Sequence, residues 1–300
     1  MNQRLLTDGG LETDLIFNRG IDLPEFAAFP LVDAEDGRAA LRSYYSAYVR
    51  LAAQVQTQLL LETPTWRANP DHAASLGYDA AALDRVNQRS VELLTQLAEE
   101  HDDELVGWQV GGVIGPRGDG YLTAGGVDPA AAADYHRPQL AAFAAAGADR
   151  ATVLTLTDVG EGIGIAQAAA DVALPVVIGF TVETDGRLPD GSTLAAAVTA
   201  VDAAAAPAYF LINCAHPTHV AHALDGGAWQ QRIGALRVNA STMSHAELDV
   251  AEELDEGDPV QLAADQLPLL AAFPNVEVLG GCCGTDVRHV AEMWGASVPS

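Results

Sequence analysis

Short apolar runs alternate with longer amphipathic or alanine-rich segments along the whole chain. Apolar runs of this length that end in Gly-, Thr- or Asp-rich turns predict buried strands, and the longer segments predict helices. The predicted strands are Leu5–Gly9, Thr57–Thr63, Leu105–Ile114, Ala151–Thr157, Pro175–Val182, Tyr209–Cys214, Gly234–Asn239 and Val276–Gly281. The predicted helices are Leu41–Val55, Ala80–Glu100, Pro129–Ala146, Ile163–Val172, Leu194–Ala205, Thr218–Leu224, Pro259–Phe273 and Val287–Trp294.

Eight strand–helix units in strict alternation imply parallel strands joined by crossover helices. Eight strands are also the number that closes into a barrel with an interior filled by side chains. The sequence therefore predicts an α/β fold, a (β/α)8 TIM barrel in a single domain over residues 1–300. A doubly wound open sheet is the alternative, although the segment Asp8–Thr13 lacks the third glycine of a dinucleotide fingerprint.

Polar residues gather at the predicted carboxyl ends of the strands. In a (β/α)8 barrel this end carries the active site, so we expect these side chains to lie around one mouth. They are Asp8, Glu62, Thr63, Asp158, Glu183, Asn213, Cys214, Asn239, Cys282 and Cys283.

The chain is strongly acidic, with 41 acidic residues against 15 basic ones and a formal net charge of −26. All 15 basic residues are arginine. Such a field repels phosphate backbones, which argues against a nucleic-acid partner. Adaptation to a high-salt cytoplasm and a GC-rich genome both account for the composition, and only the first predicts stability that falls when salt is removed.

The first residues show no basic stretch followed by an apolar run, so no secretory signal is expected. No apolar segment approaches the roughly 20 residues that cross a bilayer, which argues against a membrane partner. We therefore expect a cytoplasmic protein with reduced thiols. The pattern makes no prediction of the oligomeric state.

Three cysteines are the most informative residues of the chain. Cys214 follows the sixth predicted strand, and Cys282 and Cys283 follow the eighth. A single cysteine is usually a small buried hydrophobic residue, and a disulfide between neighbours strains the backbone. Three thiolates at one mouth instead form a soft anionic ligand set suited to Zn²⁺, with the fourth tetrahedral position open for a substrate. Glycines on both sides of the pair allow the sharp turn this requires.

A zinc ion held by three thiolates is a weak activator of water, and it is well matched to a thiol. Binding to the metal removes the proton of a thiol whose free pKa is near 8.5. The resulting thiolate can attack a methyl group carried by an onium donor. The rival interpretations are a zinc hydrolase, a non-enzymatic metal or redox module, and a ligand set in which His216 replaces one cysteine; His136 and His219 fit ordinary hydrogen-bonded roles.

Two segments are specific: Ile212–Cys214, and Gly280–Thr285, which carries Cys282 and Cys283. Less specific segments are Leu6–Leu15, Glu62–Asn69, Gly115–Gly118, Tyr135–Leu140 and Ala146–Asp149. Together these segments resemble the homocysteine S-methyltransferase family over nearly the full length. The resemblance implies a zinc-dependent barrel enzyme that methylates homocysteine, with Cys214, Cys282 and Cys283 as zinc ligands. It also implies that Asp8 and the backbone of Gly9 and Gly10 hold the amino acid end of homocysteine, and that Asn213 orients the site.

One departure from the family concerns the substrate amine. Family members usually carry a Glu near the end of the fourth strand, where this chain has Leu154. A buried ammonium without a carboxylate loses much of its binding energy, so either another acid replaces the missing one or the acceptor is a different thiol or selenol. The candidate acids are Glu12, Glu62, Asp158, Glu161 and Glu183, and we favour Glu62 or Glu183.

The methyl donor is the least defined partner. Trp66, Trp108 and Tyr121 fall in or near predicted loops and are candidates for cation–π contact with an onium group. No separate cobalamin or folate module is apparent in the sequence. We therefore expect a small-molecule thiol acceptor and a small onium donor such as S-methylmethionine, S-adenosylmethionine or a betaine.

Overall fold

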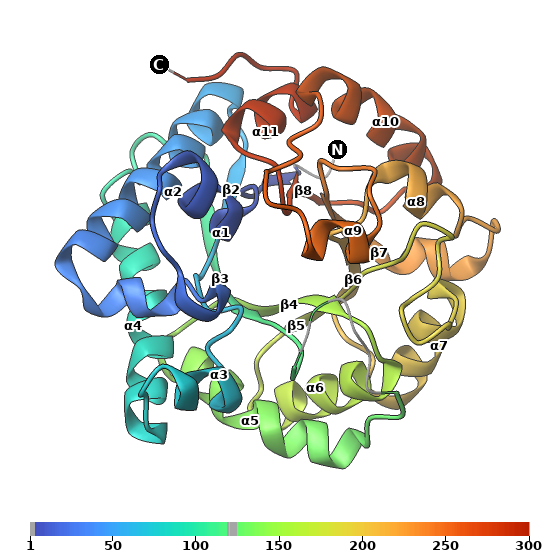
Figure 1. The fold of residues 1–300 in the computed structure, drawn as a ribbon, viewed down its shortest axis with the longest axis horizontal. Coiled ribbons are helices and arrows are strands. Elements are labelled where there is room, and N and C mark those ends of the chain that lie inside the picture. The colour runs from blue at the N-terminus through green and yellow to red at the C-terminus, as the bar shows by residue number, and fades with distance from the viewer. Residues whose placement is uncertain (1–3, 119, 121–124, 300) are drawn as a thin grey trace.

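The computed structural model describes residues 4–118, 120 and 125–299. Its strands form a closed parallel barrel in sequence order, β1 to β8, and the helices surround it (Figure 1). The predicted α/β (β/α)8 barrel is therefore confirmed, and the open sheet is wrong because β1 pairs with both β2 and β8. The strands are β1 (Leu5–Leu6), β2 (Gln58–Glu62), β3 (Trp108–Ile114), β4 (Arg150–Leu156), β5 (Val176–Phe180), β6 (Tyr209–Asn213), β7 (Ile233–Val238) and β8 (Val278–Gly281).

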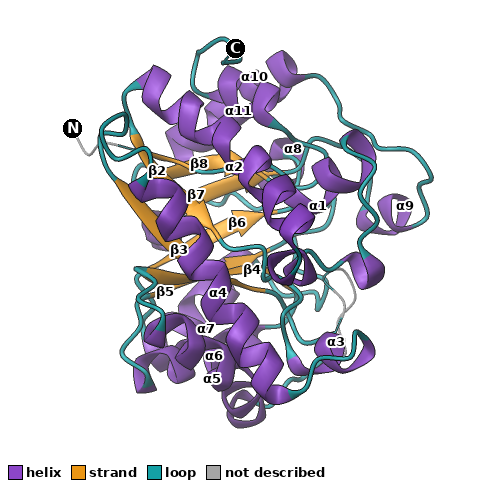
Figure 2. Ribbon diagram, turned by 90° about the vertical axis from the view of Figure 1, so that its left-hand side faces the viewer, coloured by secondary structure: helices purple, strands orange, loops and turns teal. Residues whose placement is uncertain are grey.

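Most helices pack on the outside of the barrel, and three short ones lie at one end of it. Those helices whose positions the sequence predicted are α2 (Glu35–Val55), α4 (Ala80–Glu99), α5 (Pro129–Ala145), α6 (Val159–Asp171), α7 (Leu194–Ala205), α8 (Pro217–Ala221), α10 (Pro259–Ala272) and α11 (Val287–Met293). Short helices that the sequence did not predict are α1 (Leu11–Thr13), α3 (Pro70–Ser75) and α9 (His245–Asp249). Figure 2 shows α1, α3 and α9 at the end of the barrel toward which the strands point.

Two apolar layers hold the barrel together. The inner layer takes one side chain from every strand: Leu5, Leu60, Val113, Leu154, Val177, Leu211, Ala235 and Val278. The alternate strand residues face outward and pack with the helices into a larger cluster. This follows from the two-residue period of a strand, which sends successive side chains to opposite faces. The interior is therefore a packed core that closes the barrel below the mouth.

The structure also refines the predicted boundaries. The strand expected over Leu5–Gly9 ends at Leu6, since residues 7–10 form the turn that leads into α1. The strand expected from Leu105 begins at Trp108. Among the described residues, no helix combines the length and the apolar character that crossing a bilayer requires.

Candidate active site

A cavity of about 350 Å³ lies at the carboxyl ends of the strands. Its wall includes seven of the nine residues predicted for the site: Asp8, Gly9, Gly10, Glu62, Cys214, Cys282 and Cys283. Asn213 lies behind this wall and bonds to one of its residues, whereas Glu183 faces a different part of the mouth. The turns after β1, β2, β6 and β8 therefore meet around one space, as the barrel topology requires.

The three cysteine sulfurs form one cluster. Their Sγ atoms all lie within 4.8 Å of one another, which compares with a spacing of about 3.8 Å for thiolates at 2.3 Å from a tetrahedral zinc ion. Cys214 is held in the left-handed region, with φ of 54°, because its N–H donates to the Arg237 carbonyl at 3.0 Å. The donor set and its spacing fit a zinc ion with three protein ligands.

Two asparagine side chains contact the sulfurs. Asn213 Nδ2 donates to Cys282 Sγ at 3.7 Å, and Asn239 Nδ2 donates to Cys214 Sγ at 3.9 Å. Asn213 is itself fixed by Thr155, whose N–H donates to Asn213 Oδ1 at 2.8 Å and whose Oγ1 accepts from Asn213 Nδ2 at 2.8 Å. Hydrogen bonds from the Cys214 and Cys283 thiols, together with Asn213 and the Arg237 charge, hold the pKa of Cys282 well below its usual value despite burial. Cys282 is thus favoured as the thiolate, whereas its hydrogen bonds to the other two cysteines, together with burial, raise the pKa of Cys283.

The Asp8–Gly10 turn interlocks with the loop that carries the cysteine pair. Gly10 N–H donates to the Thr285 carbonyl at 3.0 Å, and Gly281 N–H donates to the Asp8 carbonyl at 2.9 Å. A Cβ atom on Gly10 would lie 2.6 Å from the Cys282 carbonyl oxygen, so only glycine allows this approach. Gly10 and Gly281 therefore allow the turn after β1 to lie against the loop that carries Cys282 and Cys283.

Arg237 is the central charge of the site, and the sequence reasoning missed it. It projects from β7, and its side chain is 6% exposed. Its guanidinium bonds to Asp8 Oδ1 at 2.6 Å, to Glu62 Oε2, and to the carbonyls of Gly9 and Gly281, each at 2.9 Å. Although burial lowers the pKa of Arg237, the Asp8 and Glu62 charges raise it above its usual value, so Arg237 stays charged.

The two carboxylates beside Arg237 differ in how fully they are bonded. Asp8 uses Oδ1 for Arg237 and Oδ2 for the Tyr44 hydroxyl, at 3.1 Å. Burial raises the pKa of Asp8 to about 6 against the lowering effect of Arg237. Glu62 uses Oε2 for Arg237, whereas its buried Oε1 has no hydrogen-bond partner within the part of the chain that the structure describes. Glu62 therefore lines the cavity and keeps one buried acceptor oxygen that no described residue engages.

Comparison with known proteins agrees with this geometry. The family model for homocysteine S-methyltransferase matches residues 5–296. The chain belongs to the homocysteine S-methyltransferase family. It thereby belongs to a family of methyltransferase enzymes, as the sequence resemblance predicted.

The individual proteins that the chain resembles share less than 30% sequence identity with it. The chain is 29% identical over 246 residues to the methionine synthase of Mycobacterium leprae (strain TN), a match that covers 78% of the chain but 20% of that protein. The chain thus spans about a fifth of the length of this curated relative. Its fold is similar to crystal structures of the homocysteine methyltransferase MmuM from Escherichia coli. The metallated form matches with a TM-score of 0.77 and 24% identity, over 98% of this chain and 96% of that one. The apo form matches with a TM-score of 0.70 and 23% identity, over 98% of this chain and 95% of that one.

Leu154 occupies the place where the family usually has a Glu, and it lines the cavity as an apolar side chain. Of the five acids considered as replacements, only Glu12 and Glu62 line the same cavity within the described chain. Burial, together with the nearby charges of Cys282 and Asp8, raises the pKa of Glu12 to about 7.

The other three acids have structural partners. Asp158 caps α6 by accepting from the N–H of Gly160 at 2.7 Å. Glu161 bonds to His136 Nε2 at 2.8 Å, with both side chains buried. Glu183 bonds to His245 Nδ1 at 2.9 Å, and His245 Nε2 lies 3.0 Å from the Cys214 carbonyl. Glu183 thus supports the backbone of a predicted zinc ligand through His245.

The remaining histidines considered as ligands are engaged elsewhere. His216 Nδ1 lies 2.8 Å from the Thr218 hydroxyl and caps α8. His219 Nε2 lies 3.0 Å from the Thr242 carbonyl. Burial lowers the pKa of both histidines. The three cysteines are therefore the ligand set that the geometry assembles.

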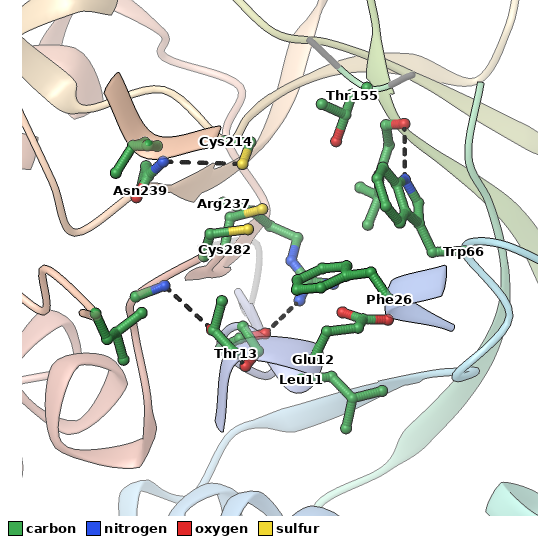
Figure 3. Close-up of a pocket in the computed structure, with 18 of the residues that line it drawn as sticks. Leu11, Glu12, Thr13, Phe26, Trp66, Thr155, Cys214, Arg237, Asn239 and Cys282 are labelled. Carbon is green, nitrogen blue, oxygen red and sulfur yellow. Dashed lines mark hydrogen bonds between the residues drawn. The ribbon is translucent and has the colours of Figure 1, made fainter. Parts of the chain in front are cut away.

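The predicted aromatic contacts are partly corrected. Trp66 lines the cavity, and its indole N–H donates to the Leu154 carbonyl at 3.3 Å (Figure 3). The prediction that Trp108 lies at the mouth is wrong, because Trp108 starts β3 at the opposite end of the barrel, where its indole N–H donates to Asp102. Tyr121 lies outside the described residues. The structure adds Phe26, whose ring centroid is 6.4 Å from that of Trp66 at the cavity.

Proposed function

We propose that this chain is a zinc-dependent S-methyltransferase that moves a methyl group from a small onium donor to the thiol of homocysteine, giving methionine. The observation that carries the proposal is the cluster of three cysteine sulfurs within 4.8 Å, at the mouth of a barrel that belongs to this family. The names of the similar Mycobacterium leprae and Escherichia coli proteins, a methionine synthase and a homocysteine methyltransferase, support the same reaction.

The residues of the chain divide the work as follows. Cys214, Cys282 and Cys283 would hold zinc, which keeps a bound substrate thiol in its thiolate form at neutral pH. Asn213 and Asn239 orient two of the sulfurs by hydrogen bonding. The Asp8–Gly10 turn holds the amino acid end of homocysteine, and its own contacts with Arg237, Tyr44 and the loop of the cysteine pair fix its position.

Glu62 takes the place of the missing family Glu as the acceptor for the substrate ammonium. Glu62 lines the cavity, it is paired with Arg237 through Oε2, and its buried Oε1 has no partner among the described residues. Glu183 is the weaker candidate, because it lies outside the cavity wall and is bonded to His245. A buried acceptor oxygen without a partner costs about 1–3 kcal/mol, which a bound ammonium recovers.

The reaction is tested by assaying methylation of homocysteine with S-methylmethionine, S-adenosylmethionine and glycine betaine, each with the zinc-loaded protein. Zinc absorption spectroscopy checks the site independently: we expect three sulfur neighbours without homocysteine and four with it. Zinc bound by the three cysteines without any methylation of a thiol would overturn the proposed reaction.

The role of Glu62 is tested with 4-mercaptobutanoate, which is homocysteine without its amine. We expect Glu62→Gln to reduce the preference for homocysteine over 4-mercaptobutanoate by about tenfold or more, the equivalent of one charged hydrogen bond. Glu183→Gln is the control and should leave this preference unchanged. If Glu62→Gln also leaves this preference unchanged, Glu62 does not bind the substrate amine. The apolar Leu154 would then favour an acceptor thiol that lacks an amine.

A further inference from the structure

Arg67 is an unneutralised cation at the cavity wall. It follows Trp66 in the turn after β2, and its guanidinium carbon lies 5.0 Å from the centroid of the Trp66 ring. Its Nε is buried and has no hydrogen-bond partner among residues 4–118, 120 and 125–299. No carboxylate of these residues lies within ion-pair distance of it.

The cavity wall carries more carboxylates than arginines. Its acidic residues are Asp8, Glu12, Glu62, Asp249, Glu253 and Asp255, and Glu12 is close enough for its charge to interact with that of Cys282. The other arginine of the wall, Arg237, is balanced there by two carboxylates. Figure 3 shows Trp66 across the cavity from Cys214 and Cys282, and Arg67 stacks on Trp66. In this acidic cavity Arg67, beside Trp66, is therefore the wall cation that no carboxylate of the described residues pairs with.

We propose that Arg67 binds a carboxylate carried by the methyl donor, so that the donor is a zwitterionic onium compound. This inference rests on the proposed methyl transfer, because it assumes that the acceptor sulfur lies beside the cysteines. A methyl carbon in line for displacement must approach that sulfur to about 3–3.5 Å. The rest of the donor then extends away from the cysteines, toward Trp66 and Arg67.

Each part of such a donor meets a matching group. The methylated cationic centre faces Glu12 and the ring of Phe26, which favour positive charge through Coulombic and cation–π attraction. The carboxylate meets the planar guanidinium of Arg67, which can donate two parallel hydrogen bonds. A cation without the carboxylate would leave Arg67 unpaired and would be repelled by it.

The inference is tested by equilibrium binding to the zinc-loaded full-length protein, which needs no turnover. The probes are two matched pairs: S-methylmethionine with (3-aminopropyl)dimethylsulfonium, and glycine betaine with tetramethylammonium. The second member of each pair lacks the carboxylate. Charged hydrogen bonds of about 1.5–3 kcal/mol predict that the wild-type protein prefers the carboxylated member of at least one pair by about 10- to 100-fold.

Three variants isolate the contribution of Arg67. Arg67→Gln should reduce the preference to about twofold or less, and Arg67→Lys, which retains a charge without the planar fork, should give an intermediate value. Arg89→Gln is the control, since it removes the same charge from an exposed ion pair with Asp33. Circular dichroism establishes that each variant is folded.

The inference is overturned if the wild-type protein shows no preference in either pair, or if Arg67→Gln weakens both members of a pair equally. It is also overturned if Arg67→Gln weakens homocysteine binding and leaves the onium probes unchanged, because Arg67 would then serve the acceptor. Arg67-dependent binding of a zwitterion without methyl transfer to any thiol would refute the proposed function and leave standing only the role of Arg67 as a carboxylate-binding residue.

Discussion

Replacement of Arg237 by Met is the most direct test of how the site is built. Arg237, Asp8 and Glu62 have side chains only 6%, 6% and 2% exposed, so none of the three charges is well hydrated. Arg237→Met preserves much of the side-chain volume and removes the only positive charge that contacts both carboxylates among the described residues. Asp8 and Glu62 must then stay ionised without a partner or take up protons.

The expected cost follows from this burial. Removing one partner of a buried ion pair typically costs about 3–5 kcal/mol. With an unfolding entropy of about 2.1 cal/mol/K per residue, this corresponds to a decrease in Tm of about 5–8 °C for a chain of this length. The exposed pair of Arg89 with Asp33 should contribute about 1 kcal/mol or less. Arg89→Met is therefore a control with the same change of charge.

The assay is chemical denaturation of both variants between pH 8 and pH 4. The pKa of Asp8 is raised to about 6 in the folded protein even with Arg237 present, against 3.8 for the ordinary group. A folded pKa above the unfolded one means that Asp8 costs stability at pH above about 6, and the cost disappears as the pH falls below about 4. Loss of Arg237 enlarges this cost, so the deficit of Arg237→Met should shrink toward pH 4. A deficit equal to that of Arg89→Met, or one that is constant with pH, would refute the reasoning.

Three further outcomes are expected. Cys214→Ser should lower zinc affinity in chelator competition and abolish methyl transfer, because two thiolates are left to hold the ion. Glu12→Gln should stabilise the protein increasingly between pH 4.5 and about 7 in denaturation experiments, since burial raises the pKa of Glu12 to about 7 and its ionisation opposes folding. The melting temperature should fall when salt is removed, because a net charge of −26 is then unscreened; a salt-independent value would favour genome composition as the origin of the acidity.

The sequence predicts the barrel and the cysteine cluster for the same physical reason. Buried parallel strands read as short apolar runs, and barrel closure brings their carboxyl ends together whatever their separation in the chain. Cys214 and Cys283 are 69 positions apart, yet both follow strands and therefore reach one mouth. Placement at the end of a strand was sufficient to predict that they meet.

The short helices that the sequence did not predict show no hydrophobic periodicity. The turns at α1, α3 and α9 contain three to six helical residues each, too few to show a helical repeat. Phe26 reaches the cavity from a single 3-10 turn, with φ of 55°. Trp108 was misplaced because the strand was expected to begin at Leu105, which obscured that Trp108 stands at its amino end.

Arg237 was missed although the sequence contains a signal for it. It is a charged residue inside an apolar strand, two positions before Asn239, and residues two apart on a strand face the same side. Since Asn239 was already expected at the mouth, Arg237 could have been assigned to the barrel interior. Its carboxylate partners come from β2 and from the turn after β1, and no local pattern identifies such pairing.

The departure at Leu154 and the ion cluster are best understood together. Leu154 joins the apolar layer of the barrel interior, so the negative charge that the family usually places there is absent. Glu62 supplies a carboxylate at the same cavity, and a charge that is 2% exposed is costly to bury without an opposite charge beside it. Arg237 provides that charge and engages only Oε2 of Glu62, so Oε1 keeps its capacity to accept a hydrogen bond. The proposed role of Glu62 therefore depends on the arginine that β7 carries.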